Sequence, residues 1–240
     1  GYYFNADKRY YDKVDYIFTI SETCKNSLMN YFPQQKDKIH VMYNIVSEKI
    51  IKKMSKDTDF NKMFELNENI IKILTLGRPT LEKGYDYCIK VCKMLKDEGY
   101  DLKWYSIGMS NEIEKFKQMA KEYSVEDIFI FLGETSNPYK YIDKIDICVH
   151  PSRFEGKAIA VDEMKILCKP ILITNFDTVY DQIENGTEGI IVNMDEESIF
   201  NGLKELIESN DLRNKLIKNL ESRDFSNEYE ILKLYKAIES

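Results

Sequence analysis

Residues 151–163 read PSRFEGKAIAVDE and follow directly on an apolar run, residues 145–150 (IDICVH). An apolar run with little alternation is typical of a strand that is covered on both faces, and residues 158–167 have the spacing of an amphipathic helix. Two glutamates lie in this strand-to-helix unit: Glu155 in the turn and Glu163 in the predicted helix. The stretch therefore predicts one unit of an α/β fold, with two carboxylates placed where the backbone can be approached closely.

Similar apolar runs alternate with helix-length amphipathic segments along the rest of the chain. This alternation predicts an α/β protein with a parallel sheet. The runs from residue 70 to residue 192 suffice for a complete doubly wound sheet, whereas the upstream runs are too few for an independent one. Residues 47–69 are rich in Lys, Asp and Asn, show no strand pattern and are interpreted as a linker. The expected strands are residues 16–20, 39–44, 70–76, 102–107, 128–132, 145–150, 170–174 and 189–192, and the expected helices are residues 85–98, 112–123, 158–167, 196–208 and 227–238.

The bulk composition limits the classes of partner. The 240 residues are 43 % hydrophobic, enough to bury a sizeable core. A net charge of -7 and a pI of about 5.1 argue against nucleic acid as a partner. The basic run EKIIKKMSK (residues 48–56) is interpreted as a solvated helix or linker face, with a membrane-surface role as the alternative. No apolar run approaches the ~20 residues of a membrane span, and the opening GYYFNADKRYYDK lacks an initiator Met and a secretory pattern.

The cysteines and histidines do not suggest a metal site. None of the five cysteines belongs to a CxxC pair, and most fall among apolar neighbours, so we expect reduced, buried thiols in a cytoplasmic protein. With His40 and His150 as the only histidines, a zinc site is not expected. His150 ends a predicted strand and is interpreted as a packed, hydrogen-bonded histidine, with acid–base chemistry as the alternative. The cysteines are Cys24, Cys88, Cys92, Cys148 and Cys168.

The loop after the strand at residues 70–76 carries two cations. It reads GRPTLEKG (residues 77–84), and its glycines leave room for a ligand. In an open parallel sheet, ligands bind where the carboxyl ends of strands lead into helices. Arg78 can direct two donors at phosphate oxygens and Lys83 adds a mobile charge, so the pair suits a diphosphate. Two solvated surface charges are the equal alternative.

The turn at residues 151–163 has the properties of an anion site. Gly156 permits close approach of a ligand, and the amides of Lys157, Ala158 and Ile159 lie at a predicted helix N-terminus. Such a terminus offers unpaired N–H groups and the positive end of the helix dipole, both of which favour anions. We therefore expect sugar or phosphate oxygens to bind there.

The two glutamates of this turn suit hydroxyl groups. A carboxylate accepts hydrogen bonds from vicinal hydroxyls, so Glu155 and Glu163 could hold a sugar and a ribose on either side of a diphosphate. The alternatives are a simple interaction of Glu155 with the helix dipole and a surface ion pair of Glu163 with Lys165 or its neighbours. The loop at residues 107–112 is a weaker candidate: Gly108 permits a tight turn, but no GxGxxG, Walker, G-x-S-x-G or HExxH motif occurs in the chain.

Four stretches, taken in order, resemble a known family. They are GRPTLEKG (residues 77–84), FLGETSN (131–137), HPSRFEGKAIAVDEMKILCKPILITNF (150–176) and QIENGTEGIIV (182–192). Together they resemble the donor-binding half of the retaining glycosyltransferases of family 4, which have the GT-B fold. The third stretch further resembles bacterial enzymes that build capsular or other surface polysaccharides. The resemblance implies a Rossmann-like doubly wound parallel sheet that binds a nucleotide-sugar.

The same resemblance implies a role for each candidate residue. Arg78 and Lys83 would stabilise the diphosphate of a UDP- or GDP-sugar as the glycosidic bond breaks, and Glu155, the third catalytic candidate, would contact the donor sugar. Glu163 would bind the ribose hydroxyls. Transfer would retain the anomeric configuration and need no metal or other cofactor. The further donor-binding residues that the resemblance implies are Gly77, Gly108, Leu132, Gly133, Gly156, Lys157, Ala158 and Ile159, with the base near residues 132–134.

The resemblance also implies a domain plan. Residues 1–46 would be a remnant of an N-terminal acceptor-binding Rossmann domain, 47–69 an interdomain linker, 70–224 the donor-binding domain and 225–240 a helix that crosses back to the N-terminal domain. We therefore expect a donor-binding fragment that transfers sugar poorly or not at all by itself. A glycan or a lipid-linked acceptor would bind through the absent domain.

Alternative functions and partners stay open. One is a module that holds a nucleotide-sugar without transferring it, and another is a nucleotide-sugar epimerase with the GT-B fold. Peripheral attachment to the inner face of the cell membrane is a further hypothesis. Exposed apolar surface near the N-terminus and on the last helix favours self-association.

Overall fold

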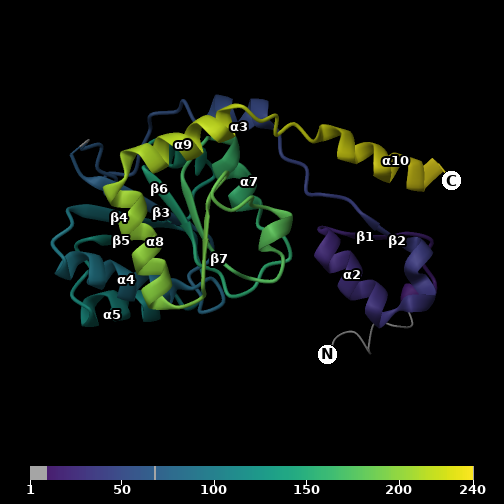
Figure 1. Cartoon of the computed structure of the whole chain (residues 1–240), viewed down its shortest axis with the longest axis horizontal. Helices are drawn as coiled ribbons and strands as arrows, with labels where there is room; N and C mark the ends of the chain where they lie inside the picture. The colour runs from purple at the N-terminus through teal and green to yellow at the C-terminus, as the bar shows by residue number, and fades with distance from the viewer. Residues whose placement is uncertain (1–9, 68, 240) are drawn as a thin grey trace. The chain divides into compact units, whose positions relative to one another are not determined.

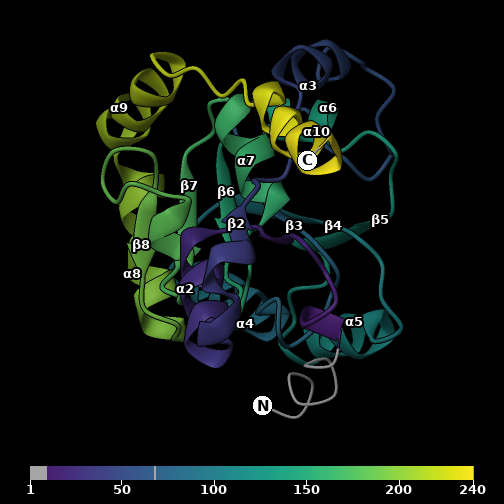
Figure 2. The ribbon, with the colours of Figure 1, turned by 90° about the vertical axis from the view of Figure 1, so that its right-hand side faces the viewer.

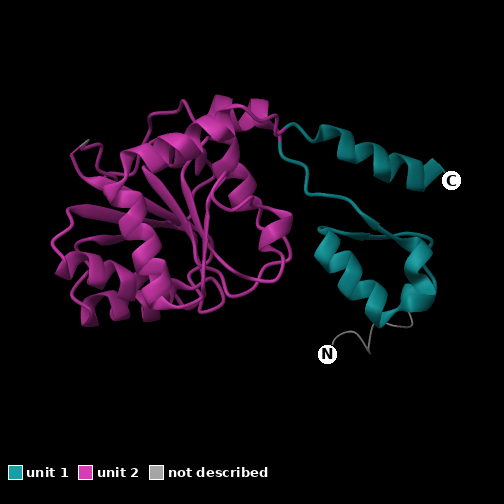
Figure 3. Cartoon of the chain, viewed as in Figure 1, with its two compact units in different colours: residues 1–46, 226–240 teal, residues 47–225 magenta. Residues whose placement is uncertain are grey.

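The computed structural model of the chain describes residues 10–67 and 69–239. It contains two compact units, coloured separately in Figure 3: residues 47–225 make up the larger unit, and residues 1–46 with 226–240 make up the smaller one. Residues 1–9, part of the stretch without a secretory pattern, lie outside the described residues. Among the residues that are described, no helix combines the length and the apolar character needed to cross a membrane.

The larger unit is built on one parallel sheet with the strand order β5-β4-β3-β6-β7-β8 (Figure 1). All neighbouring strands run parallel, which confirms the predicted doubly wound sheet. The order reverses between β3 and β6, and ligands bind such sheets in the crevice beyond the carboxyl ends of these two strands. The strands are β3 (Ile71–Leu76), β4 (Leu102–Ile107), β5 (Phe129–Gly133), β6 (Ile147–His150), β7 (Ile171–Thr174) and β8 (Ile190–Val192), each inside or within one residue of its expected range.

Helices cover both faces of this sheet. Successive strand residues point to opposite faces, so Trp104 and Tyr105 of β4 belong to two different buried clusters. The helix α8 lies beside β7 and β8 in two views at right angles (Figure 2). The helices that pack on the Trp104 face are α4 (Tyr85–Asp97), α5 (Ile113–Glu122), α8 (Glu196–Glu208) and α9 (Asn210–Glu221), and those on the Tyr105 face are α6 (Tyr139–Asp143) and α7 (Ile159–Ile166).

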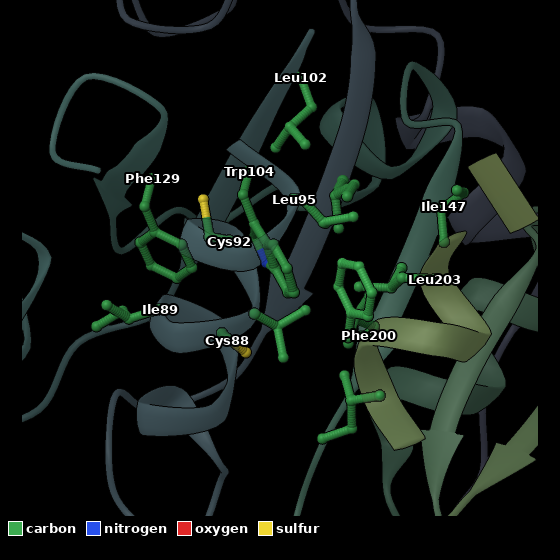
Figure 4. Close-up of a cluster of buried hydrophobic side chains, with 14 of the residues drawn as sticks. Cys88, Ile89, Cys92, Leu95, Leu102, Trp104, Phe129, Ile147, Phe200 and Leu203 are labelled. Carbon is green, nitrogen blue, oxygen red and sulfur yellow. The ribbon is translucent and has the colours of Figure 1, made fainter. Parts of the chain in front are cut away.

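The core on the Trp104 face is dense and apolar (Figure 4). Trp104 is fully buried, its indole N–H donates to Thr75 Oγ1 at 3.0 Å, and its ring centroid lies 5.7 Å from that of Phe129. Cys88 and Cys92 of α4 join this cluster, and burial raises the pKa of the Cys88 thiol to about 12. These protonated thiols behave as small apolar side chains, as the sequence predicted for buried cysteines.

Residues 47–67, which we interpreted as a linker, pack on the larger unit. They begin with α3 (Glu48–Met54), whose lysines are exposed while Ile51 is buried. Further along, the ring of Phe64 is buried, with its centroid 4.6 Å from that of Tyr105 and 5.1 Å from that of Tyr141. A single aromatic anchor produces no periodic pattern, so this contact was not visible in the sequence.

The smaller unit contains a short parallel sheet of β1 (Ile17–Thr19) and β2 (Ile39–Val41). The helices α2 (Glu22–Tyr31) and η1 (Pro33–Lys38) connect the two strands. Both strands fall inside their expected ranges. A small core forms between the strands and these helices, from Ile17, Leu28, Phe32 and Ile39.

The end of the chain belongs to the same smaller unit. It forms η3 (Glu228–Glu230) and α10 (Ile231–Glu239), close to the single helix expected over residues 227–238. The carboxylate of Glu230 is 1 % exposed and accepts the amide of Tyr43 at 2.9 Å. The side-chain oxygen of Asn227 accepts the amide of Val46 at 3.1 Å. The segment after β2 and the segment that leads into α10 are therefore joined by partly buried hydrogen bonds.

Candidate functional site

A cavity of about 520 Å³ opens at the carboxyl edge of the sheet, where the loops after β3, β4, β5 and β6 meet the start of α7. This volume is within the usual range for small-molecule sites, and the place is the switch point of the strand order. Most of the predicted site residues line it: Gly77, Arg78, Lys83, Gly108, Glu155, Lys157, Ala158, Ile159 and Glu163.

The cavity wall after β5 begins at Glu134, the last residue of the expected range 132–134, and continues beyond that range. Leu132 packs against the buried cluster on the Tyr105 face, and Gly133 offers its carbonyl to the amide of Gly108 at 2.9 Å. The side chains that line the cavity from this loop are those of Glu134, Thr135 and Pro138. Gly156 is also outside the lining, although both of its neighbours in sequence contribute to it.

Glycines allow the strand ends to approach each other closely at the cavity. The amide of Gly77 donates to the carbonyl of Ile107 at 2.9 Å, which continues the ladder of β3 and β4 by one residue. Gly108 has a φ of +144°, and a Cβ at this position would lie 2.0 Å from the carbonyl oxygen of Gly77. Only glycine fits there, and the backbone of both loops is left open to a ligand.

The loop at residues 77–84 packs directly on the loop after β6. Gly84 has a φ of +69°, and a Cβ there would lie 2.1 Å from the carbonyl oxygen of Pro151. The amide of Arg153 donates to the carbonyl of Glu82 at 2.7 Å, and its guanidinium forms two hydrogen bonds with Asp86 at 2.7 and 2.8 Å. These contacts bring the two predicted loops into one site.

Glu155 is the centre of a partly buried polar cluster. Its carboxylate forms an ion pair with Lys83, accepts a hydrogen bond from Ser152 Oγ at 2.8 Å and lies 3.0 Å from Nε2 of His150. Burial alone would raise the pKa of Glu155, but His150, Lys83 and Ser152 outweigh it and lower that pKa to about 2. Glu155 is thus ionised at neutral pH. His150 is packed and hydrogen-bonded, as expected, and its partners are Glu155 and Ser152.

Glu163 is also half-buried but has a different environment. The hydroxyl of Tyr139 donates to its Oε1 at 2.9 Å. Burial raises the pKa of Glu163, and the neighbouring charge of Asp162 raises it further. The alternative of a surface ion pair with Lys165 is wrong, because Lys165 pairs with Glu188 at 2.9 Å.

The cations of the site differ in their surroundings. Arg78 is exposed and forms no ion pair with any residue between 10 and 239 that the structure describes. Lys157 lies 3.5 Å from a carboxylate oxygen of Asp162. The amide of Ala158, one of the predicted anion-binding groups, is already engaged, because it donates to Gln182 Oε1 at 3.1 Å. Within the described part of the chain, no group of three His, Cys, Asp or Glu side chains could hold a metal ion.

The chain belongs to a family of sugar-transferring enzymes. Residues 56–223 match the sequence model of the family described as glycosyl transferases group 1. The match spans most of the chain and includes every residue of the cavity. The predicted family is thereby confirmed.

Two curated relatives are glycosyltransferases of bacteria. One is the N-acetylgalactosamine-N,N'-diacetylbacillosaminyl-diphospho-undecaprenol 4-alpha-N-acetylgalactosaminyltransferase of Campylobacter jejuni, 27 % identical over 212 residues that cover 87 % of this chain and 55 % of the relative. Another is CapM of Staphylococcus aureus, a capsular polysaccharide biosynthesis glycosyltransferase, 26 % identical over 212 residues that cover 85 % of this chain and 55 % of CapM. The chain thus spans about half the length of these relatives.

Solved structures share the fold. A glycosyltransferase of Rickettsia africae superposes with a TM-score of 0.82 at 18 % identity and covers 97 % of this chain and 66 % of that protein. HepE of Anabaena, solved with UDP and glucose, gives a TM-score of 0.79 at 14 % identity over 95 % of this chain and 63 % of HepE. At these identities the likeness establishes the fold, which agrees with the GT-B prediction.

Proposed function

We propose that the cavity binds a nucleoside-diphosphate sugar and that this chain is the donor-binding half of a retaining glycosyltransferase. The observation that carries the proposal is the gathering of two cations, Arg78 and Lys83, and two half-buried carboxylates, Glu155 and Glu163, around one cavity at the switch point of the sheet. Cations suit a diphosphate, and carboxylates suit the hydroxyl groups on either side of it. Membership of the glycosyl transferases group 1 family supports this proposal.

In the proposed complex, Arg78 and Lys83 bind the diphosphate. Arg78 is exposed at the cavity with its donors available, whereas Lys83 exchanges its ion pair with Glu155 for a phosphate oxygen. As the bond from the anomeric carbon to the phosphate oxygen breaks, negative charge grows on the leaving diphosphate. Positioned cations lower the energy of that state, without a divalent ion in the step.

The two carboxylates bind the donor on either side of its diphosphate. Glu155 remains ionised and fixed by His150 and Ser152, so it can accept hydrogen bonds from the donor sugar after Lys83 has turned away. Glu163 accepts hydrogen bonds from the ribose. An acceptor hydroxyl then attacks from the face that the diphosphate leaves, through an oxocarbenium-like state, and its proton passes to the departing phosphate. The configuration at the anomeric carbon is retained.

The acceptor is a glycan or a lipid-linked sugar. The relatives extend well beyond the half that this chain matches, and we assign acceptor binding to that other half. Since CapM is named for capsular polysaccharide biosynthesis, we place the reaction in the assembly of a bacterial surface polysaccharide, in the cytoplasm at the inner face of the membrane.

A thermal-shift screen with UDP, GDP, ADP and their hexose conjugates tests the proposal. A ligand at 100 times its dissociation constant adds about 2.7 kcal/mol to the free energy of unfolding. We expect one nucleotide family to stabilise the wild type and Glu163→Ala to lose most of that shift. Glu197→Ala, an exposed glutamate on α8, serves as the control and should keep it. Absence of a shift with every nucleotide would contradict the proposal.

A further inference from the structure

We infer that Tyr139 is a positioning residue, which holds the carboxylate of Glu163 in the orientation that recognises the two hydroxyls of the donor ribose. This inference rests on the proposed function and extends it to a residue outside the cavity lining. Tyr139 acts through Glu163 and does not itself contact the nucleotide.

One carboxylate oxygen of Glu163 is bonded to the protein, and the other is available to a ligand. The hydroxyl of Tyr139 donates to Oε1 at 2.9 Å. The other oxygen, Oε2, has no hydrogen-bond partner among the described residues, although Glu163 lines the cavity. A carboxylate oxygen accepts two hydrogen bonds, so Oε2 and the second lone pair of Oε1 are left for the vicinal hydroxyls of a ribose.

The position of Tyr139 is set by the fold and does not depend on Glu163. Tyr139 opens α6 and packs against the buried cluster on the Tyr105 face. Just before it, the side-chain amide of Asn137 donates to the carbonyl of Met54 at 3.0 Å, which ties the loop after β5 to α3. The hydroxyl of Tyr139 is therefore a fixed donor against which the flexible Glu163 side chain is aligned.

Electrostatics gives the hydrogen bond a second effect. Burial and the charge of Asp162 both oppose ionisation of Glu163, whereas the bond from Tyr139 favours it and lowers the pKa of that carboxyl. Burial and the adjacent Glu163 raise the pKa of Tyr139 to about 12, so the phenol keeps its proton and remains a donor. The pair thus orients the carboxyl group of Glu163 and favours its ionised form.

Discrimination between ribose and 2′-deoxyribose provides the test, because it reports the hydrogen bond from the 2′-hydroxyl to Glu163. Titration calorimetry compares UDP with 2′-deoxy-UDP, and GDP with 2′-deoxy-GDP, on wild type and Tyr139→Phe. We expect the wild type to prefer the ribonucleotide by roughly tenfold or more, the value of one hydrogen bond to a charged group. In Tyr139→Phe the preference should fall below about threefold, with most of the loss in ribonucleotide affinity.

Two further variants separate positioning from a general structural effect. Tyr100→Phe removes another tyrosine–glutamate hydrogen bond, the one to Glu208 outside the cavity, and should leave the preference unchanged. In a Glu163→Ala background, Tyr139→Phe should have no further effect on the preference, since its only route to the ribose is gone.

The outcomes keep the two proposals apart. A wild type that binds ribonucleotides, with the same preference retained in Tyr139→Phe, would overturn the role of Tyr139 and leave the proposed function standing. Equal weakening of both ligands in Tyr139→Phe would also overturn it, because orientation of Glu163 would not be what was lost. A wild type that binds no nucleotide would overturn both.

Discussion

Lys83 and Glu155, 72 positions apart in the sequence, form an ion pair on two loops that touch through Gly84 and Pro151. In this arrangement the charge of Lys83 is neutralised while Glu155 keeps two further partners, His150 and Ser152. A diphosphate that enters the cavity can therefore bind Lys83 while His150 and Ser152 still hold Glu155 in place. The pair links the diphosphate end of the proposed site to the sugar end.

The first prediction concerns Arg78, which lines the cavity and forms no ion pair within the described residues. Arg78→Ala should weaken nucleoside-diphosphate binding by tenfold or more, and Arg78→Lys should give an intermediate loss, because Lys keeps the charge but not the two-donor geometry. Titration calorimetry at fixed salt measures both. Lys62→Ala, an exposed lysine outside the cavity, is the control. Unchanged affinity in Arg78→Ala would refute this role.

The second prediction concerns the acid stability that Glu155 provides. Its pKa falls from an ordinary value of 4.5 to about 2 on folding, so the ionised carboxylate stabilises the folded state above pH 4.5. That contribution is lost as the pH drops from 4.5 toward 2. Glu155→Gln should therefore lower the free energy of unfolding at pH 7 by about 1.5–3 kcal/mol, the value of a charged hydrogen bond, with a smaller difference at pH 3.

Urea denaturation at pH 7, 5 and 3 measures this difference. Glu197→Gln, on the exposed side of α8, should show little effect at any of the three pH values. A deficit in Glu155→Gln that stays constant from pH 7 to pH 3 would mean that the substitution acts through packing and not through the ionised carboxylate.

The third prediction is a pH dependence of donor binding set by Glu163. Burial raises the pKa of this carboxyl above its ordinary value, so it takes up a proton at a higher pH than an exposed glutamate does. Affinity for UDP-glucose or GDP-mannose should fall as the pH drops through that raised pKa, and Tyr139→Phe should move the midpoint upward. Glu163→Gln should bind weakly and with a flat profile. A midpoint that is the same in Tyr139→Phe and wild type would count against the coupling.

The fourth prediction uses two glycines with positive φ. Gly108→Ala adds a Cβ at 2.0 Å from the carbonyl oxygen of Gly77, whereas Gly99→Ala has a φ of +86° but no atom within 4 Å. Gly99→Ala should cost about 1–2 kcal/mol from backbone strain alone. Gly108→Ala should cost clearly more and also weaken nucleotide binding, because the backbone at the cavity must move. Equal melting temperatures of the two variants would contradict the close approach.

The strands and the site loops were predictable because their signals are local. Each strand of the larger sheet lies in an apolar run and is three to six residues long, and the loops at residues 77–84 and 151–163 follow such strands directly. Since the carboxyl ends of parallel strands share one edge, the residues of these loops were expected to meet, and Lys83 and Glu155 do.

The remaining features depend on contacts between distant residues. Tyr139 looks like any aromatic residue near a helix start, and its bond to Glu163 exists only because α6 and α7 are neighbours in the fold. The occupied amide of Ala158 depends in the same way on Gln182. The packing of residues 47–67 depends on the ring of Phe64. Sequence periodicity indicates which face of an element is buried, but it does not indicate which side chain of another element packs against that face.

The most direct test of the central claim is a crystal structure of the chain with the UDP- or GDP-sugar that stabilises it most. The account predicts the diphosphate at the carboxyl ends of β3 and β6, within hydrogen-bond distance of Arg78 and Lys83, with the ribose on Glu163 and the sugar on Glu155. A nucleotide-sugar bound outside this cavity, or inside it with its diphosphate away from both cations, would contradict the account.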